Sequence, residues 1–489
     1  MVGLNSFDLN LQPLSHTIRN GVEYGLVSTD SRSDLAILAP ADWNPLTSFE
    51  GQTIRQGKQT LLLCPLNPRN CNALRAQIPW LQPRLLGLQT SAGLGDRLGL
   101  ATPGHIRAIR AVQGNIAPIF AQQSIREMTR CGRTPQQVLC DATWGVFSQG
   151  WQSGFGADAD HLKTTQDIDI CLAAGFTFFT IDPGDQVDNR AGTASLSELR
   201  ELAGRLPAEI QPTQSGLEGK HFRIEDLQVD FNEATLLRSA VKYGRAILHV
   251  ATLYRHLVEA AGDLPFELEV SVDETEQPTS HQEHVYITSE LRRLGVVWIS
   301  LAPRYVGGFE KGVDFIGNPA DFETDIAGHA AIARHFGPYK LSLHSGSDKF
   351  SIYSAAVRQT HGMVHLKTAG TSYLEALRTI AAIDIDFFRE IFTFARQHYE
   401  ADRASYHVSA ELGRAPLPAS ASEYAAVLDQ FDAREILHVT FGSVLTGKTA
   451  AGAWLFRDRI LDFLHTHAET YASNLENHFI RHLTYFVSG

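Results

Sequence analysis

The chain has 489 residues, of which 44% are hydrophobic and 20% charged, the balance of a globular protein long enough to bury a large core. Its formal net charge of −12 excludes a nucleic-acid partner, because phosphate binding requires a basic face. An anionic small molecule stays possible, since a few Lys and Arg residues are enough to form a local positive pocket.

Cysteine usage and the N-terminus predict the compartment. The cysteines are odd in number and lack C-x-x-C spacing, so we interpret them as free thiols of a reducing compartment: Cys64, Cys71, Cys131, Cys140 and Cys171. No basic flank precedes an apolar stretch at the N-terminus, so we expect no signal peptide. No segment approaches the roughly 20 apolar residues that a membrane span requires. We therefore expect a cytoplasmic protein with no membrane partner, and the oligomeric state stays open.

The first 80 residues differ in pattern from the rest. They contain short apolar segments, such as Tyr24–Ser28 and Thr60–Cys64, separated by turn-forming pairs. This pattern predicts a small β-rich N-terminal region over residues 1–80, followed by a catalytic domain over residues 84–489.

From residue 84 onward, short apolar strands alternate with amphipathic helices, which is typical of β/α units. The candidate strands are Leu85–Gln89, Pro118–Gln122, Phe176–Asp182, Phe266–Val272, Val296–Ala302, Lys340–His344, Met363–Lys367 and Ile436–Thr440. Eight strands close a barrel, so the predicted fold class is α/β, a TIM-like (β/α)8 barrel. A ninth candidate, Ala159–Lys163, leaves an open doubly wound sheet as the alternative.

Two further helical regions are expected. Residues 184–263 are too many for one connection and predict a helical insertion with helices over Leu196–Leu206 and Glu233–Ala261. Near the end, residues 456–467 and 471–482 predict outer helices.

Several predicted strands alternate apolar with polar residues, as in Glu267-Leu268-Glu269-Val270. In a barrel, the apolar set packs against the outer helices and the polar set points inward. Barrel active sites lie at the carboxyl ends of the strands. The pattern therefore predicts a polar, functional barrel interior.

Two segments supply candidate carboxylates. Around Asp158, Asp160, His161 and Lys163, a glycine-rich loop could serve a metal or acid/base chemistry, or simply cap a helix. The strand with Glu267, Glu269 and Asp273 places like charges on one face, which requires a cation or a basic partner. The structural alternative is a salt bridge to Lys340 or Lys367.

Histidines at strand ends predict a metal site. His344, His365 and His438 lie on three of the predicted strands, and neutral imidazole is a common ligand of transition metals. We expect the histidines outside these strands to be surface or capping residues.

Residues Gly442–Thr449 match the phosphate-loop pattern G-x-x-x-x-G-K-[ST]. Too few residues follow to build the rest of a nucleotide triphosphatase. A milder interpretation keeps the turn after the last predicted strand as an anion site, with Lys448 near a substrate carboxylate.

Longer motifs carry a family resemblance. The segments 157–164, 178–183, 341–353 and 365–377 together resemble the bacterial tagaturonate epimerase family, whose members interconvert tagaturonate and fructuronate with a divalent metal. The likeness spans residues 87–449 and weakens over the first eighty.

This resemblance implies a sugar-acid substrate and a retro-aldol step, because the inverted carbon lies β to the ketone. We assign His161, His344 and His365 to the metal, and Asp160 and Glu269 to the acid and base. Asp273 is the reserve candidate for a fourth metal ligand or for either of these two acid/base roles. The candidate substrate-binding residues are Lys163, Lys367, Lys448, Ser347, Asp348 and Asp182. His and carboxylate ligands suit Mn, Co, Ni and Zn alike. The alternatives are a metal-dependent aldolase or lyase, an epimerase of a neutral ketose, and a non-catalytic sugar-binding barrel.

Overall fold

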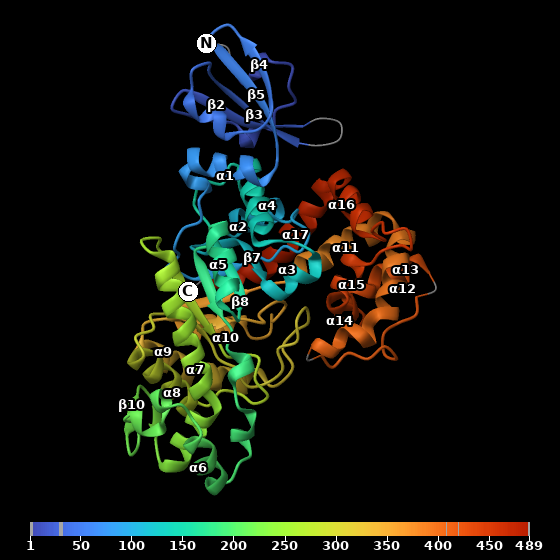
Figure 1. The fold of residues 1–489 in the computed structure, drawn as a ribbon. Coiled ribbons are helices and arrows are strands. Elements are labelled where there is room, and N and C mark those ends of the chain that lie inside the picture. Colours follow the sequence, from blue (N-terminus) through green and yellow to red (C-terminus); the bar gives the residue numbers. More distant parts are fainter. Residues whose placement is uncertain (1–2, 29–32, 407, 419, 488–489) are drawn as a thin grey trace.

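The computed structural model describes residues 3–28, 33–406, 408–418 and 420–487. At the N-terminus, an antiparallel sheet of order β1-β2-β3-β5-β4 stands apart from the rest of the molecule (Figure 1). Its strands are β1 Thr17–Arg19, β2 Val22–Ser28, β3 Ser33–Pro40, β4 Gln52–Gln56 and β5 Gln59–Pro65. Helix α1, Pro68–Gln77, leads from this sheet towards the barrel.

The centre of the molecule is a closed barrel of parallel strands in the order β12-β13-β14-β15-β6-β7-β8-β9. The strands are β6 Ser91–Gly93, β7 Ala117–Ser124, β8 Gly156–Leu162, β9 Phe178–Ile181, β12 Glu267–Ser271, β13 Ser300–Ala302, β14 Lys340–Leu343 and β15 Val364–Lys367. Closure confirms the predicted α/β barrel with an N-terminal β-rich region and excludes the open doubly wound sheet. The domain boundaries at residues 80 and 84 stay a prediction.

Two predicted strands are wrong. Of the segment Ile436–Thr440, the first four residues lie in helix α14, Phe431–Val439, and Thr440 is its C-cap; the N-cap Gln430 accepts a hydrogen bond from the Ala433 amide. A segment of five residues is too short for its pattern to distinguish a strand from a buried helical turn. The first barrel strand is β6 rather than Leu85–Gln89, and its three small residues carry almost no strand signal. The ninth candidate, over 159–163, proves to be part of β8 and restores the count.

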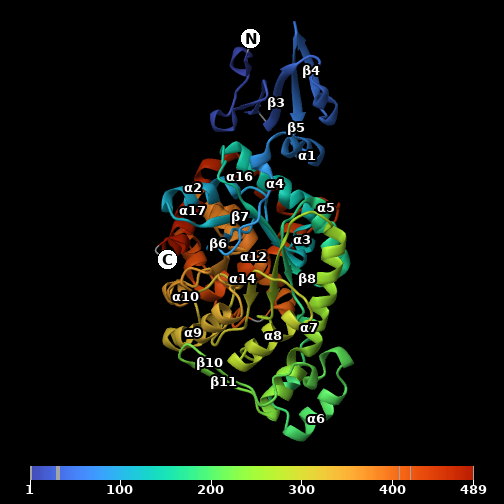
Figure 2. The same ribbon diagram turned by 90° about the vertical axis from the view of Figure 1, so that its left-hand side faces the viewer.

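Helices surround the barrel and extend it on two sides (Figures 1 and 2). Those in the barrel half are α2 Thr102–Val112, α3 Ile125–Cys131, α4 Pro135–Ser148, α5 Thr165–Ala174, α8 His281–Arg293, α9 Pro319–Phe336 and α10 Tyr353–Thr360. The insertion holds α6 Leu196–Gly204, the hairpin β10 His221–Ile224 and β11 Leu227–Asp230, and α7 Glu233–Ala261. The C-terminal lobe holds α11 Thr371–Ile383, α12 Ile385–Asp402, α13 Ala421–Ala426, α14, α15 Phe441–Thr446 and α16 Arg457–Thr466, and α17 Ala468–Leu483 returns to pack on α2.

Helix α7 has the bounds that its apolar periodicity predicts. Asn232 caps its N-terminus by accepting a hydrogen bond from the Thr235 amide, and Gly262 ends it with a positive φ of 55°. Its buried face carries Lys242, whose ammonium lies 3.0 Å from the Glu283 carboxylate of α8. This ion pair ties the insertion to the barrel wall.

The five cysteines are free and buried, in agreement with the sequence. Among the described residues, no helix is both long and apolar enough to cross a bilayer.

The Glu283→Gln substitution should destabilise the fold, because it leaves the Lys242 ammonium buried without its counter-charge. We expect the free energy of unfolding to fall by about 3 kcal/mol, measured by urea denaturation. The exposed pair Arg200–Glu233 provides the control, since Glu233→Gln should change stability little. Equal effects of the two substitutions would contradict a structural role for the buried pair.

Candidate active site in the barrel

The barrel interior is charged, and one ammonium group organises it. Lys367 of β15 points into the barrel, where its Nζ lies 2.8 Å from Asp160, 3.0 Å from Asp158 and 3.0 Å from Glu269. It also donates a 2.8 Å hydrogen bond to the Thr180 hydroxyl. All these side chains are buried. Lys367 therefore neutralises the carboxylates of β8 and β12. For Glu269, this is the salt bridge to a lysine that the sequence analysis gave as the alternative to a cation site.

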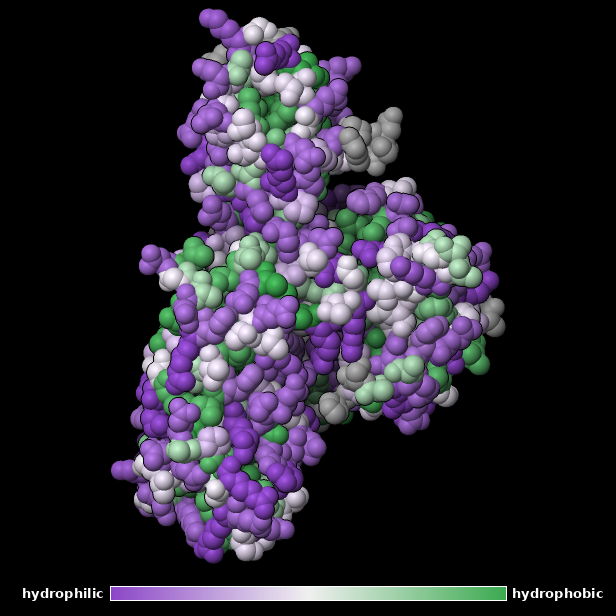
Figure 3. Space-filling view, in the orientation of Figure 1, coloured by the Kyte–Doolittle hydropathy of each residue, from purple (hydrophilic) through white to green (hydrophobic). Residues whose placement is uncertain are grey.

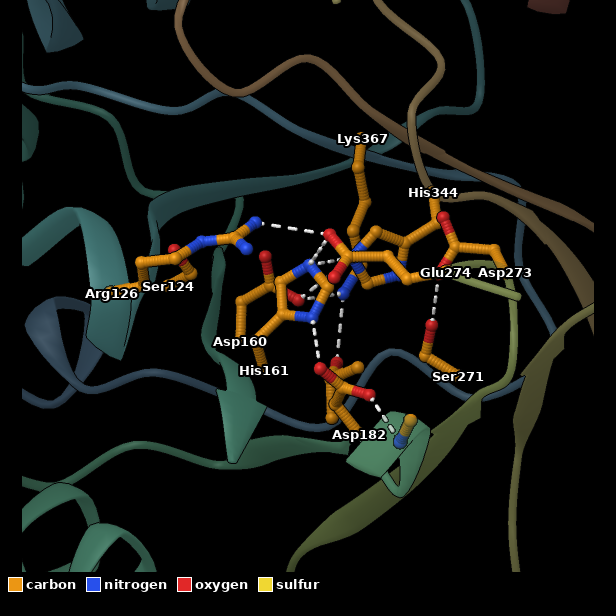
Figure 4. Close-up of polar contacts among 12 residues, drawn as sticks. Ser124, Arg126, Asp160, His161, Asp182, Ser271, Asp273, Glu274, His344 and Lys367 are labelled. Carbon is orange, nitrogen blue, oxygen red and sulfur yellow. Dashed lines mark hydrogen bonds and ion pairs between the residues drawn. The ribbon is translucent and has the colours of Figure 1, made fainter. Parts of the chain in front are cut away.

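Two imidazoles lie beside the Lys367 ammonium: His161 near the carboxyl end of β8, and His344 directly after β14 (Figure 4). The Nε2 atoms of His161 and His344 face each other at 2.8 Å. His344 Nε2 is 3.3 Å from Asp160 and its Nδ1 is 3.3 Å from Glu269. His161 is held by Asp182, whose carboxylate accepts a 3.0 Å hydrogen bond from Nδ1. His161 also has a positive φ of 53°, an uncommon conformation for a residue other than glycine.

The charges in this cluster shift its pKa values strongly. Burial disfavours the charged form of Glu269, but Lys367 and His344 outweigh burial and lower its pKa. Burial likewise opposes the charge on His344, yet Asp273 and Asp160 raise its pKa to about 10. Burial raises the pKa of Asp158 to about 6, despite Lys367. The carboxylates around His344 therefore favour a positive charge on its imidazole.

This arrangement fits a divalent transition metal. Donor atoms of Asp160, His161 and His344 all lie within 4.8 Å of one another, and all three residues are buried. The Asp182 carboxylate accepts the hydrogen bond of His161 Nδ1, so Nε2 of His161 faces the other two donors. Metal-binding histidines commonly have a carboxylate hydrogen-bonded to the ring nitrogen that does not bind the metal. Two imidazoles and a carboxylate suit Mn, Co, Ni or Zn.

A cavity of about 730 Å³ opens at the barrel mouth above these residues. His344 forms its floor, and Asp273 and Glu274 from the loop after β12 line its wall. The opposite wall comes from the C-terminal lobe, through Tyr406 and its neighbours. Figure 3 shows the corresponding hollow between the barrel and that lobe, edged with hydrophilic surface. The volume suits a six-carbon sugar acid with its hydration water.

Comparisons with known proteins agree with this geometry. The sequence model of the family described as UxaE, tagaturonate epimerase, matches residues 20–486. The chain belongs to the tagaturonate epimerase family. It is therefore an enzyme of the isomerase class.

Individual relatives cover almost the whole chain. The tagaturonate/fructuronate epimerase of Thermotoga maritima is 42% identical over 475 residues, which cover 96% of this chain and 95% of the relative. The native crystal structure of the fructuronate-tagaturonate epimerase UxaE from Cohnella laeviribosi superposes with a TM-score of 0.92 at 36% identity, covering 99% of this chain and 97% of that one. A glycerol complex of the same Cohnella enzyme gives a TM-score of 0.91 at 36% identity, with the same coverage.

The structure brings together only part of the site predicted for this epimerase-family chain. Asp160, His161, His344, Glu269, Lys367 and Asp182 form one connected cluster. His365 takes another place: its Nδ1 lies 2.9 Å from the Ser91 hydroxyl and its ring packs against Phe178. It therefore lies outside the donor group around His161 that the described residues form.

The other candidates divide between the rim and the scaffold. Lys163 lines the cavity and pairs with Asp185 at 2.9 Å. Ser347 and Asp348 hold loops together: the Ser347 hydroxyl accepts from the Gly312 amide, and Asp348 pairs with Arg434 at 3.2 Å.

The structure removes the basis of the anion site around Lys448. Helices α14 and α15 replace the barrel strand that this prediction required. The Lys448 ammonium stacks on the Trp454 ring at 4.3 Å and is not among the residues that line the described cavity. His438 likewise lies on α14 rather than on a barrel strand, although it reaches the cavity wall.

Sequence reasoning missed much of the cavity wall in this epimerase-family fold. Arg126, Lys311, Glu274 and Tyr406 line it, and Arg126 binds Glu274 at 3.0 Å. Arg126 lies two residues after the end of β7, so its position near a strand end was an available signal. Tyr406 belongs to the C-terminal lobe, and no pattern in the neighbouring sequence predicts that it lines the barrel cavity.

Lys367→Met should destabilise the enzyme in a pH-dependent way. Three carboxylates would lose their counter-charge, so we expect a loss of about 3 kcal/mol or more near pH 8. Their pKa values would rise in the folded variant, so the loss should shrink as the pH falls towards 5.5 and the carboxylates take up protons. In the parent protein, the pKa of Glu269 is lowered, so its contribution is lost only below the ordinary carboxylate range.

Urea denaturation at pH 8 and pH 5.5 measures this effect. Lys163→Met is the matched control, because Lys163 lies at the rim and its removal should change stability little at either pH. A Lys367→Met loss that does not depend on pH would contradict the assignment of Lys367 as the neutralising charge.

Proposed function

We propose that the chain interconverts D-tagaturonate and D-fructuronate with a divalent metal held by Asp160, His161 and His344. The observation that carries this proposal is the converging donor group of these three residues below a cavity of sugar size. The curated Thermotoga relative, named as a tagaturonate/fructuronate epimerase, supports the substrate pair. The free, buried thiols support the cytoplasmic location that the sequence predicts.

The substrate chemistry restricts the mechanism. In a 5-keto-hexuronate, the carbon that inverts is C3, which lies β to the ketone, so its hydrogen is not acidic and simple enolisation cannot invert it. A retro-aldol step can: a base takes the proton of the C3 hydroxyl, the C3–C4 bond breaks, and its electrons pass to C4 and the C5 oxygen as an enediolate. The C3 aldehyde then rotates, the bond forms on the other face, and the proton returns to the C3 oxygen.

A divalent cation on the three donors would act as a Lewis acid towards the ketone and stabilise the negative charge that grows on its oxygen. The protein side chains have to supply everything else. Asp182 fixes the ring of His161, and Lys367 fixes the carboxylate of Asp160 beneath it. A ligand set held this firmly costs little reorganisation when the reacting oxygens develop charge.

The proton-transferring groups need access to the substrate. Asp160 and Glu269, the predicted pair, are buried and bound by Lys367, and the lowered pKa of each makes it a weak base. Asp273 and Glu274 instead line the cavity from the loop after β12. The Ser271 hydroxyl donates to Asp273 at 2.5 Å, and Glu274 lies 3.9 Å from His161 Nε2. We assign the base to Asp273 and assign Glu269 to positioning His344. Glu274 stays ionised beside them, because His161 and Arg126 outweigh burial and lower its pKa to about 2.

A sugar acid also requires a cation for its carboxylate. Lys163, Arg126, Arg304 and Lys311 all line the cavity, which places four basic side chains around it. The Arg304 guanidinium donates a hydrogen bond to the Thr275 carbonyl oxygen. The charge of Lys163 is partly neutralised by Asp185, and that of Arg126 by Glu274. Lys311 is therefore the principal carboxylate anchor in this assignment.

The first test is proton NMR of tagaturonate with purified protein, before and after chelation and after metal restoration. We expect fructuronate to form, to stop after chelation and to return with Mn, Co, Ni or Zn. His344→Ala should lose both turnover and bound metal. Conversion that persists in metal-free protein would overturn the metal assignment, and release of three-carbon fragments would identify a lyase instead.

Two substitutions separate the candidate bases. Asp273→Asn should lower kcat by about 100-fold or more, because general-base catalysis contributes roughly that factor, while bound metal stays unchanged. Glu269→Gln should instead weaken metal binding, since it removes a partner of His344. Near-normal turnover of Asp273→Asn together with a metal-replete but inactive Glu269→Gln would return the base to Glu269.

A further inference from the structure

A second group of metal-type donors lies in the barrel wall, outside the cavity. It joins the start of α8 to the middle of α9, two helices that lie side by side (Figures 1 and 2). His281 is the first residue of α8, and Asp325 and His329 lie one turn apart on α9. Surface or capping positions were expected for the histidines of this region, but His284 and His329 are buried.

The donor atoms converge on one point. Asp325 Oδ1 lies 3.8 Å from His281 Nε2 and 3.6 Å from His329 Nε2. Ligands at about 2 Å from a tetrahedral zinc ion stand roughly 3.3 Å apart, so only small movements would close this group around an ion. Asp325 Oδ2 accepts a 3.0 Å hydrogen bond from the Val306 amide, which turns the other oxygen towards the histidines.

Hydrogen bonds on the far side of the His329 ring hold it in an orientation suited to binding a metal ion. His329 Nδ1 lies 2.8 Å from His284 Nδ1, and His284 Nε2 lies 2.8 Å from the Tyr339 hydroxyl. When His284 donates to Tyr339, its Nδ1 accepts the proton of His329 Nδ1. That arrangement leaves the lone pair of His329 Nε2 pointing at Asp325 and His281, with the far nitrogen supported as in metal sites.

His329 is 0% exposed, and no described side chain forms a hydrogen bond with its Nε2, although the Thr279 backbone lies close enough to interact with the ring. Such an atom is costly unless something binds it. Gly328 makes room for the His281 ring, because a Cβ at this helical position would overlap that ring. A glycine inside a helix costs stability, and here it admits the imidazole.

We propose that His281, Asp325 and His329 bind a second transition-metal ion, of the class of Zn²⁺, with water in the remaining position. Binding would displace the Nε2 proton of His281, which now bonds the Asp325 carbonyl oxygen at 3.1 Å. The ion would clamp α8 to α9 and, through Val306, the loop after β13. Tyr305 of that loop lines the cavity, and its ring packs against His329. The site is therefore structural, and it supports the cavity wall without belonging to it.

Metal stoichiometry tests the proposal independently of turnover. Untagged full-length protein is stripped with chelator, dialysed against micromolar Zn²⁺, and analysed for bound zinc by mass spectrometry. We expect two equivalents in the parent protein, one in His281→Ala, one in His344→Ala and none in the double variant. Asp325→Asn serves as a second variant of the site. His256→Ala is the matched control, since His256 forms a comparable histidine–carboxylate pair with Asp169 on the surface.

The outcomes separate this site from the barrel site. A His281→Ala protein that keeps the full zinc content of the parent overturns the proposal, as does a loss of equal size in His256→Ala. A parent protein that binds one equivalent, lost in His281→Ala but not in His344→Ala, supports this site and removes the metal from the proposed function. Zinc should also raise the Tm of His344→Ala but not that of the double variant.

Discussion

The ammonium of Lys367 is the interaction on which the active-site half of the barrel depends. Three carboxylates from two strands converge on it inside the fold, where unpaired charges are costly. Lys367 comes from β15, across the barrel from β8 and β12, so the ion cluster crosses the interior and fixes these strands relative to one another. Because Asp160 and Glu269 both reach from this cluster to His344, the position of the imidazole depends on the same charge.

The site therefore has two layers with different duties. The lower layer is buried, ionised and saturated with partners, which suits support rather than proton transfer. The upper layer, around Asp273 and Glu274, faces the cavity, where its side chains can reach a bound molecule. In the proposed mechanism, this division separates the side chains that would hold a metal from the base that would take the proton. It places Glu269 of β12 in the lower layer and Asp273 and Glu274 of the following loop in the upper one.

The sequence predicted the features that depend on local pattern. Alternation along β12, β14 and β15 places Glu269, His344 and Lys367 inside a barrel, and the periodicity of residues 233–261 defines α7. Features set by distant contacts were not predictable. The three small residues of β6 form a strand only because β7 and β15 flank them, and Ile436–Val439 is helical because it packs within a lobe of helices. The depth of His365 followed from barrel register, which no single strand reveals.

The C-terminal lobe belongs to the site rather than merely adjoining it. Tyr406 lines the cavity opposite the loop after β12, and the guanidinium groups of Arg126 and Arg130, from α3, lie over its ring at 5.8 and 4.7 Å. These contacts couple the position of the lobe to Arg126, which in turn binds Glu274 at the cavity wall. A barrel without this lobe would expose its charged mouth to bulk water, where the attraction of a carboxylate to Lys311 weakens. The lobe thus supplies the low-dielectric wall that lets a strongly acidic protein hold an acidic sugar.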